Sequence, residues 1–258
     1  ASAVLASVST ALAEILGAAI GLRMIFPGLP LQAGAVLAMA VVIVMLVTNS
    51  YPKLEKLIVA FVSLIGLAFL YEILLVHVPW GTVALSWVRP SLPRGSMLIV
   101  MSVLGAVVMP HNLFLHSEII QSREWNLQDE KVIRRQLKYE FTDTLFSMGI
   151  GWAINSAMLI IAAATFFGKS RITEIEQAHS MLGPLVGPTA AAVFALALLL
   201  AGLASSVTAG MAGSTVFAAM FGETYDIRDL HSKLGAGVTL LLATAGIFLI
   251  GDPFKALL

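Results

Sequence analysis

Long apolar runs separated by short polar connections occupy nearly the whole chain. Seven of these runs approach or exceed the roughly 20 residues with which an α-helix crosses a ~30 Å hydrocarbon core. They cover residues 2–26, 31–49, 57–78, 96–121, 141–167, 186–220 and 234–250. The pattern therefore predicts an all-α, polytopic membrane protein with about seven transmembrane helices.

Lys and Arg residues are distributed unequally between the connections. The second, fourth and sixth connections hold nine of them, whereas the other connections and the C-terminal tail hold six. Most of this difference comes from the loop 122–140, which is rich in both charge signs. Because basic residues accumulate on the cytoplasmic side of membrane proteins, we expect this loop to be cytoplasmic and the first span to run outward.

Composition supports this class of protein and excludes several functions. Hydrophobic residues make up 59% of the chain and charged residues 12%, and the mean hydropathy is +0.93. A net charge of zero without a basic tract argues against nucleic acid as a partner. The absence of cysteine excludes disulfides, thiolate metal sites and cysteine nucleophiles. No motif of a zinc or serine hydrolase is present, so we do not expect an enzyme.

The fourth run contains a proline in its middle, within the stretch from Gly105 to His116. Proline has no N–H, so the carbonyl one turn earlier loses its intrahelical donor, and we expect the helix to break near Met109. In a membrane such irregular backbone persists where protein or a water-filled cavity receives the freed groups, and broken helices often build the sites of secondary transporters.

Unusual ligands surround this break. Met109 offers a thioether, which favours late transition metals over magnesium or calcium, and Ala106 offers its carbonyl. His111 and Asn112 follow on the first turn of the second half-helix. Together these groups suggest a passage for a metal ion. The alternative is a gap-filling methionine beside a simple proline kink.

The first span carries a carboxyl group, Glu14, near the middle of the membrane. Acidic groups at this depth are costly and usually face a cavity or a partner, which makes Glu14 a candidate proton carrier. The alternative is a structural role, with a protonated Glu14 hydrogen-bonded to a neighbouring helix. Gly17, Ala18 and Gly21 form a small-residue face that permits close helix packing.

The second half of the broken helix carries His116 and Arg123, seven residues apart and therefore on one stripe. Such a stripe leads from the break toward the cytoplasmic end and would suit a proton relay or a metal exit. The alternative is that His116 bonds a neighbouring helix and Arg123 extends to the interface. Glu118 lies between them and would be placed to pair with Arg123.

Residues outside these motifs carry weaker signals. Glu72 lies near the end of the third span with His77, so we expect its charge to reach water at the outer surface and interpret it as structural. The connection 79–95 reads as an extracellular loop with interfacial tryptophans. The connection 168–187 carries a capping box at 173–176, which predicts a short outer helix.

Several of these motifs together resemble one family. The run Met-Pro-His-Asn-Leu-Phe-Leu-His-Ser from Met109 to Ser117 is similar to the sixth-helix signature of the Nramp family of divalent metal transporters. The first span resembles the third helix of that family, with Glu14 at the acidic position of its Ala-Thr-Asp-Leu-Ala-Glu motif. Residues 201–213 resemble its eighth helix.

The resemblance implies helices three to nine of a LeuT-like inverted-repeat transporter fold. On this basis residues 1–258 form a single transmembrane transporter domain that is a fragment of a longer one. The first two helices and the tenth onward would lie outside this sequence. That reading agrees with the start of the chain at Ala1, inside an apolar segment.

The function implied by the resemblance is import of a divalent transition metal, manganese or iron(II), by alternating access. It assigns the Ala106 carbonyl and the Met109 sulfur to the metal. It assigns the proton or ion route to four residues, which are Glu14, His111, His116 and Arg123.

Proton coupling stays open, because Val4 and Ala11 stand where the family has carboxylates. The alternatives are a proton-uncoupled or magnesium-type carrier, or a transport-dead membrane sensor or scaffold. We expect no cofactor beyond the transported ion, no nucleic-acid partner, and a monomer in the inner (plasma) membrane.

Overall fold

The computed structural model describes residues 2–48, 51–121, 128–168, 172 and 175–249. These residues form ten α-helices and no strand. In chain order the helices are α1 (Ser2–Ile25), α2 (Leu31–Thr48), α3 (Tyr51–Leu75), α4 (Trp80–Val88), α5 (Met97–Val107), α6 (Pro110–Gln121), α7 (Glu130–Phe166), α8 (Ile175–Val186), α9 (Pro188–Ala219) and α10 (Leu230–Leu249).

Seven segments in the described residues are long and apolar enough to cross a membrane, as the hydrophobic pattern predicts. Six of them correspond to single helices, which are α1, α2, α3, α7, α9 and α10. The seventh is the pair α5 and α6, which covers Met97–Gln121. The predicted short outer helix is also present as α8, although residues 173 and 174 of its expected capping box lie outside the described residues.

Two elements differ from the sequence prediction. The helix of the fifth span begins at Glu130, well before the predicted position 141, because Asp129 caps it: Oδ1 accepts hydrogen bonds from the Lys131 and Val132 amides at 2.9 and 3.4 Å. An ion pair between Glu130 and Arg134 at 2.7 Å supports the same first turns. The connection 79–95, which we interpret from sequence as a loop, contains the short helix α4.

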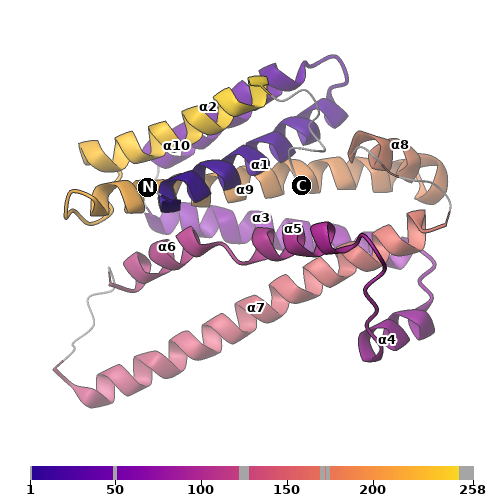
Figure 1. Ribbon diagram of the computed structural model, residues 1–258, viewed down its shortest axis with the longest axis horizontal. Helices are drawn as coiled ribbons and strands as arrows, with labels where there is room; N and C mark the ends of the chain where they lie inside the picture. The colour runs from indigo at the N-terminus through magenta and orange to yellow at the C-terminus, as the bar shows by residue number, and fades with distance from the viewer. Residues whose placement is uncertain (1, 49–50, 122–127, 169–171, 173–174, 250–258) are drawn as a thin grey trace.

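The core forms around α1 and α9, which lie side by side with α2 and α10 on one side and α3 on the other (Figure 1). Small residues allow this close approach. A Cβ atom placed on Gly202 of α9 would lie 2.5 Å from the Ala18 nitrogen and 2.6 Å from the Glu14 carbonyl oxygen. A Cβ atom on Gly21 would lie 2.7 Å from the Leu199 nitrogen. The predicted small-residue face of the first span is therefore a helix-packing surface.

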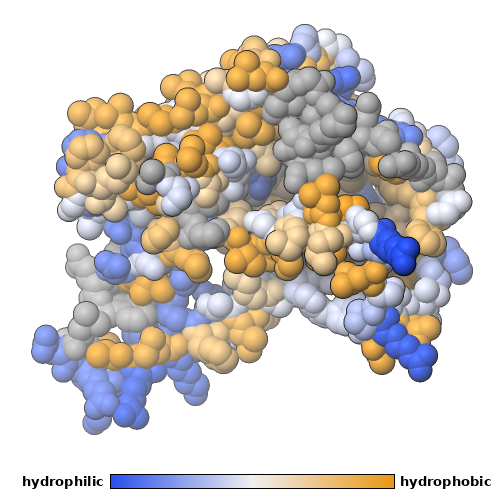
Figure 2. Space-filling view, in the orientation of Figure 1, coloured by the Kyte–Doolittle hydropathy of each residue, from blue (hydrophilic) through white to orange (hydrophobic). Residues whose placement is uncertain are grey.

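The helices at the periphery are more weakly attached. In α7 the buried side chains are Ile161 and Thr165, both near its C-terminal end, and none is buried in α5. Figure 1 shows α7 close to the bundle at that end and far from it at the other. Hydrophobic side chains cover much of the surface, whereas hydrophilic ones gather where α7 begins (Figure 2). An apolar exterior of this kind suits contact with lipid.

Glu72 does not occupy the environment that the sequence position predicts. Its residue surface is only 2% exposed, and it lies on the face of α3 that also presents Ile65 and Phe69. Ile161 of α7 and Ala197 of α9 belong to the same buried cluster. The expectation that its charge reaches water is therefore wrong, because two other helices cover this face.

Candidate metal-binding site

The fourth membrane segment is interrupted at residues 108 and 109, where the proline pattern predicts a break. Helix α5 ends at Val107, Val108 adopts φ −94° and ψ 88°, and α6 begins at Pro110. The Val108 amide still donates to the Leu104 carbonyl at 2.8 Å, and the Asn112 amide donates to the Met109 carbonyl at 3.0 Å. The residue four positions after Ala106 is Pro110, so proline leaves the Ala106 carbonyl without its usual helical donor.

A cavity of about 480 Å³ lies against this break. Helix α1 lines one side with Ser9, Thr10, Ala13 and Glu14, and α5 lines the other from Leu98 to Ala106. Met109 completes the lining. The tertiary structure thus brings Glu14 to one cavity with Ala106 and Met109, which lie more than ninety positions later in the sequence.

Met109 has a side-chain partner within the break. The Asn112 Nδ2 group donates to its sulfur at 3.6 Å, while the Asn112 Oδ1 atom is buried without a hydrogen-bond partner among the described residues. Buried polar atoms are rarely left unpaired, and an amide oxygen is an acceptable ligand for a divalent cation. Asn112 therefore both orients the thioether and adds an oxygen beside it.

Asn112 is a site residue that the sequence prediction places at the break without giving it a role. The signal was present in the spacing, since a residue three positions after Met109, on the first turn of α6, can reach back to its side chain. The described residues contain no cluster of three or more His, Asp or Glu side chains able to hold a metal ion. Among the described residues, the donors at this break are a sulfur and neutral oxygens.

The position of Glu14 is compatible with both interpretations of the sequence, a carboxyl group that faces a cavity and one that is hydrogen-bonded to a neighbouring helix. It lines the cavity, and its carboxyl group lies within hydrogen-bonding reach of the Ser205 side chain on α9. The close contact between Gly202 and the Glu14 backbone fixes the height of this carboxyl group along the helix pair. A group held in this way can face an ion in the cavity while it keeps a partner on the opposite side.

The predicted histidine and arginine stripe is described only in part. His116 lies on α6 with an exposed side chain and is not among the residues that line the cavity. The His111 side chain and all of Arg123 lie outside the described residues. Glu118, which the sequence would allow to pair with Arg123, accepts a hydrogen bond from the Tyr225 amide at 3.0 Å. This bond attaches α6 to the segment between α9 and α10.

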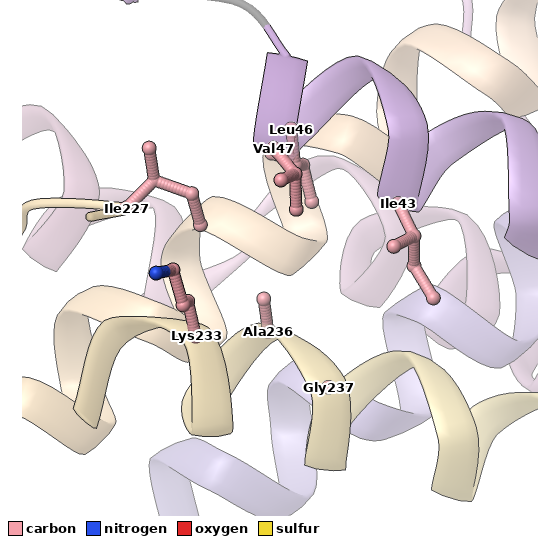
Figure 3. A pocket seen from close by; sticks show the side chains of 7 residues that line it. All are labelled: Ile43, Leu46, Val47, Ile227, Lys233, Ala236 and Gly237. Atoms are coloured by element: carbon pink, nitrogen blue, oxygen red, sulfur yellow. The ribbon is translucent and has the colours of Figure 1, made fainter. Parts of the chain in front are cut away.

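Two other cavities are less suited to a metal ion. One of about 70 Å³ is lined by apolar side chains of α2 and of the region near α10, together with Lys233 (Figure 3). A lysine ammonium group repels cations, and the neighbouring side chains shown there carry no oxygen. Another, of about 580 Å³, lies between the end of α1, α8 and the start of α9, and His179 contributes the one imidazole of its lining.

Comparison with known proteins gives consistent matches. Two curated relatives are both named divalent metal cation transporter MntH. The protein from Brucella suis is 39% identical over 221 residues, which cover 82% of this chain and 48% of the relative. The protein from Caldanaerobacter subterraneus subsp. tengcongensis is 36% identical over 265 residues, which cover 100% of this chain and 60% of the relative.

Structural comparison agrees with the sequence matches. The crystal structure of a mutant of the manganese transporter from Eremococcus coleocola matches with a TM-score of 0.82 and 26% identity, over 99% of this chain and 57% of that one. This similarity confirms the predicted LeuT-like all-α fold. The chain spans about half the length of the relatives that it matches.

The family assignment rests on the complete chain. The family model described as natural resistance-associated macrophage protein-like matches residues 1–258, without a gap at either end. Its match includes the broken helix and the cavity described above. This chain belongs to the Nramp family.

Proposed function

We propose that this chain forms part of a secondary transporter that imports divalent transition metal ions, manganese or iron(II), by alternating access. The observation that carries the proposal is the cavity at the helix break, which is lined by Ala106 and Met109 on one side and by Glu14 on the other. The relatives named as divalent metal cation transporters, and the manganese transporter of similar fold, support the same substrate class.

The ligand chemistry favours a transition metal over magnesium. Magnesium demands oxygen ligands in near-ideal octahedral geometry and gives up its hydration water reluctantly. A thioether is a soft ligand and would replace one of those oxygens poorly. Manganese and iron(II) accept mixed sets of sulfur and oxygen, so the break at Met109 suits them better. Further oxygen ligands would come from segments of the transporter outside this sequence.

A proton route accompanies the metal in this proposal. It begins at Glu14, which lines the cavity, and continues through His111, His116 and Arg123 toward the end of α6. We assign the loop 122–140 to the cytoplasmic side on the distribution of basic residues. The same proposal places the protein in the plasma membrane.

The test is manganese uptake by the full-length protein in proteoliposomes, with and without an inward proton gradient. We expect uptake, and we expect the gradient to accelerate it. An uptake rate that is the same with and without the gradient would contradict proton coupling but would still support metal transport. The absence of uptake would contradict transport and would favour a membrane sensor.

Ligation is tested with Met109→Ala. We expect this variant to lose about tenfold of its preference for manganese over calcium, which corresponds to ~1.4 kcal/mol. The matched control is Met97→Ala, which removes an exposed methionine of the same membrane segment that does not line the cavity. Equal metal preference in the two variants would contradict ligation by Met109.

A further inference from the structure

A second buried carboxyl group lies outside the cavity at the helix break. Glu72 is 2% exposed, and its Oε1 atom is buried without a hydrogen-bond partner among the described residues. It shares one face of α3 with Ile65 and Phe69, at spacings of three and four residues. This face packs against α7 and α9, and we call the contact the α3–α7–α9 seam.

The facing helix contributes a second unpartnered polar group to this seam. Thr165 of α7 is also 2% exposed, and no described residue hydrogen-bonds its Oγ1 atom. Helices α3 and α7 run in the same direction (Figure 1), and a Cβ atom on Gly66 would lie 3.3 Å from the Ile154 Cδ1 atom. Glu72 lies six residues beyond Gly66, and Ile161 lies seven residues beyond Ile154. Glu72 and Ile161 therefore lie at a similar position along the helix axes, and Thr165 lies one turn further along α7.

No charged group in the described part of the seam faces Glu72. The outer half of α7 (150–166) and the first half of α9 (188–201) contain no Lys, Arg, His, Asp or Glu. Tyr71 directs its hydroxyl to Thr189 at 3.3 Å, and His77 is exposed. On α8, Glu176 pairs with Arg23 at 3.8 Å, and His179 lines the separate outer cavity.

An ionised Glu72 would therefore be a charge without an ion-pair partner among the described residues, on a helix face that two other helices cover, which is strongly unfavourable. A metal cation would need about six oxygen ligands, whereas the unpartnered groups of the seam are one carboxyl group and one hydroxyl group. A proton satisfies the carboxyl group without further ligands. The chemistry of the seam thus selects a proton as the bound ion.

The attachment of α7 indicates how this proton can leave. Of its two buried side chains, Ile161 belongs to the buried cluster of the seam and Thr165 follows one turn later on the same helix, whereas the N-terminal part of α7 lies away from the bundle (Figure 1). A displacement of α7 therefore exposes the seam to water while the α1 and α9 pair keeps its packing. Water would stabilise the carboxylate and accept the proton.

We propose that Glu72 is an intramembrane proton-binding site, separate from the metal cavity, which holds a proton while the α3–α7–α9 seam is closed and releases it when α7 moves away. The site gives the chain a second protonatable carboxyl group in addition to Glu14. It does not depend on which metal the protein transports, or on whether the protein transports one.

The first test is infrared spectroscopy of the purified full-length protein at neutral pH. We expect a C=O stretching band of a protonated carboxyl group that disappears in Glu72→Gln, an isosteric variant that cannot ionise. The control, Glu55→Gln, alters an exposed carboxyl group of the same helix and should retain the band. Unchanged folding of Glu72→Gln is checked by gel filtration. A folded Glu72→Gln variant with the same carboxyl bands as the wild type would overturn the proposal.

The second test asks whether release requires the seam to open. The chain has no cysteine, so a Gly66→Cys/Ile154→Cys pair can be joined across α3 and α7 with a short bifunctional thiol reagent. We expect the band of Glu72 to disappear at alkaline pH in the unlinked protein and to persist in the linked protein. Loss of the band at the same pH in both would overturn release by movement of α7. Neither result requires metal uptake, so failure of the transport proposal is distinguished from failure of this one.

Discussion

The chemistry at the break between α5 and α6 depends on a few individual side chains and on their hydrogen-bond partners. In the proposed site Met109 would supply the soft ligand, and its sulfur accepts a hydrogen bond from the Asn112 Nδ2 group at 3.6 Å. Pro110 frees the Ala106 carbonyl because it has no N–H to donate. These three effects are local, since all the residues involved lie within seven positions of one another. The sequence alone therefore carries most of the information about this half of the site.

At the same scale, Asn112→Ala should weaken metal binding without unfolding the protein. The variant removes the donor that orients the Met109 sulfur and the buried amide oxygen beside it. One neutral hydrogen bond contributes roughly 0.5–1.5 kcal/mol, so we expect the KM for manganese uptake to rise about three- to tenfold. Ser117→Ala is the control, because the exposed Ser117 hydroxyl donates to the Leu113 carbonyl of its own helix. Equal KM values in the two variants would remove Asn112 from the site.

The helices differ in how much of their position the sequence could predict. Apolar length is sufficient to find the membrane segments, because a bilayer requires about 20 residues whatever their neighbours are. Helix α4 and the early start of α7 were missed because they lie outside the apolar runs, where turn and capping interactions such as those of Asp129 decide the structure. For the contact between α1 and α9, the sequence predicts a small-residue packing face on α1. It does not predict that α9 is the helix that packs there.

The packing of α1 on α9 gives a prediction at the element scale. Gly202→Ala should destabilise the protein by ~1–3 kcal/mol, because the new methyl group would overlap the backbone of Ala18 and Glu14 and force the helices apart. The measurement is the thermal unfolding midpoint in detergent. Gly149→Ala is the control, since a Cβ atom there meets nothing within 4 Å. A Gly202→Ala variant as stable as this control would mean that the two helices do not pack as described.

The whole molecule combines a compact group of helices with peripheral ones. Helices α1, α2, α9 and α10 bury most of the large cluster of core side chains, whereas α5 and α7 expose most of theirs. The cavity lies between these two parts, with α1 on one side and α5 on the other.

Orientation in the membrane is a prediction for the whole molecule. In variants with a single cysteine, Lys131→Cys at the start of α7 should react with an impermeant thiol reagent only from the cytoplasmic side. Ser91→Cys, between α4 and α5, should react only from the outside. The expected pattern follows from the excess of basic residues in the loop 122–140. Labelling of Lys131→Cys in intact cells would reverse the assignment.

The sequence by itself determined the number of membrane segments, the position of the break and the presence of a soft sulfur donor beside it. Each of these follows from length, from a missing N–H or from the chemistry of one side chain. Only the tertiary structure decided that Glu14 lies across a cavity from Ala106 and Met109, and that Glu72 is buried instead of reaching water. The physical reason is that both outcomes depend on which helices cover a given face, and this contact between distant segments leaves no local pattern in the chain.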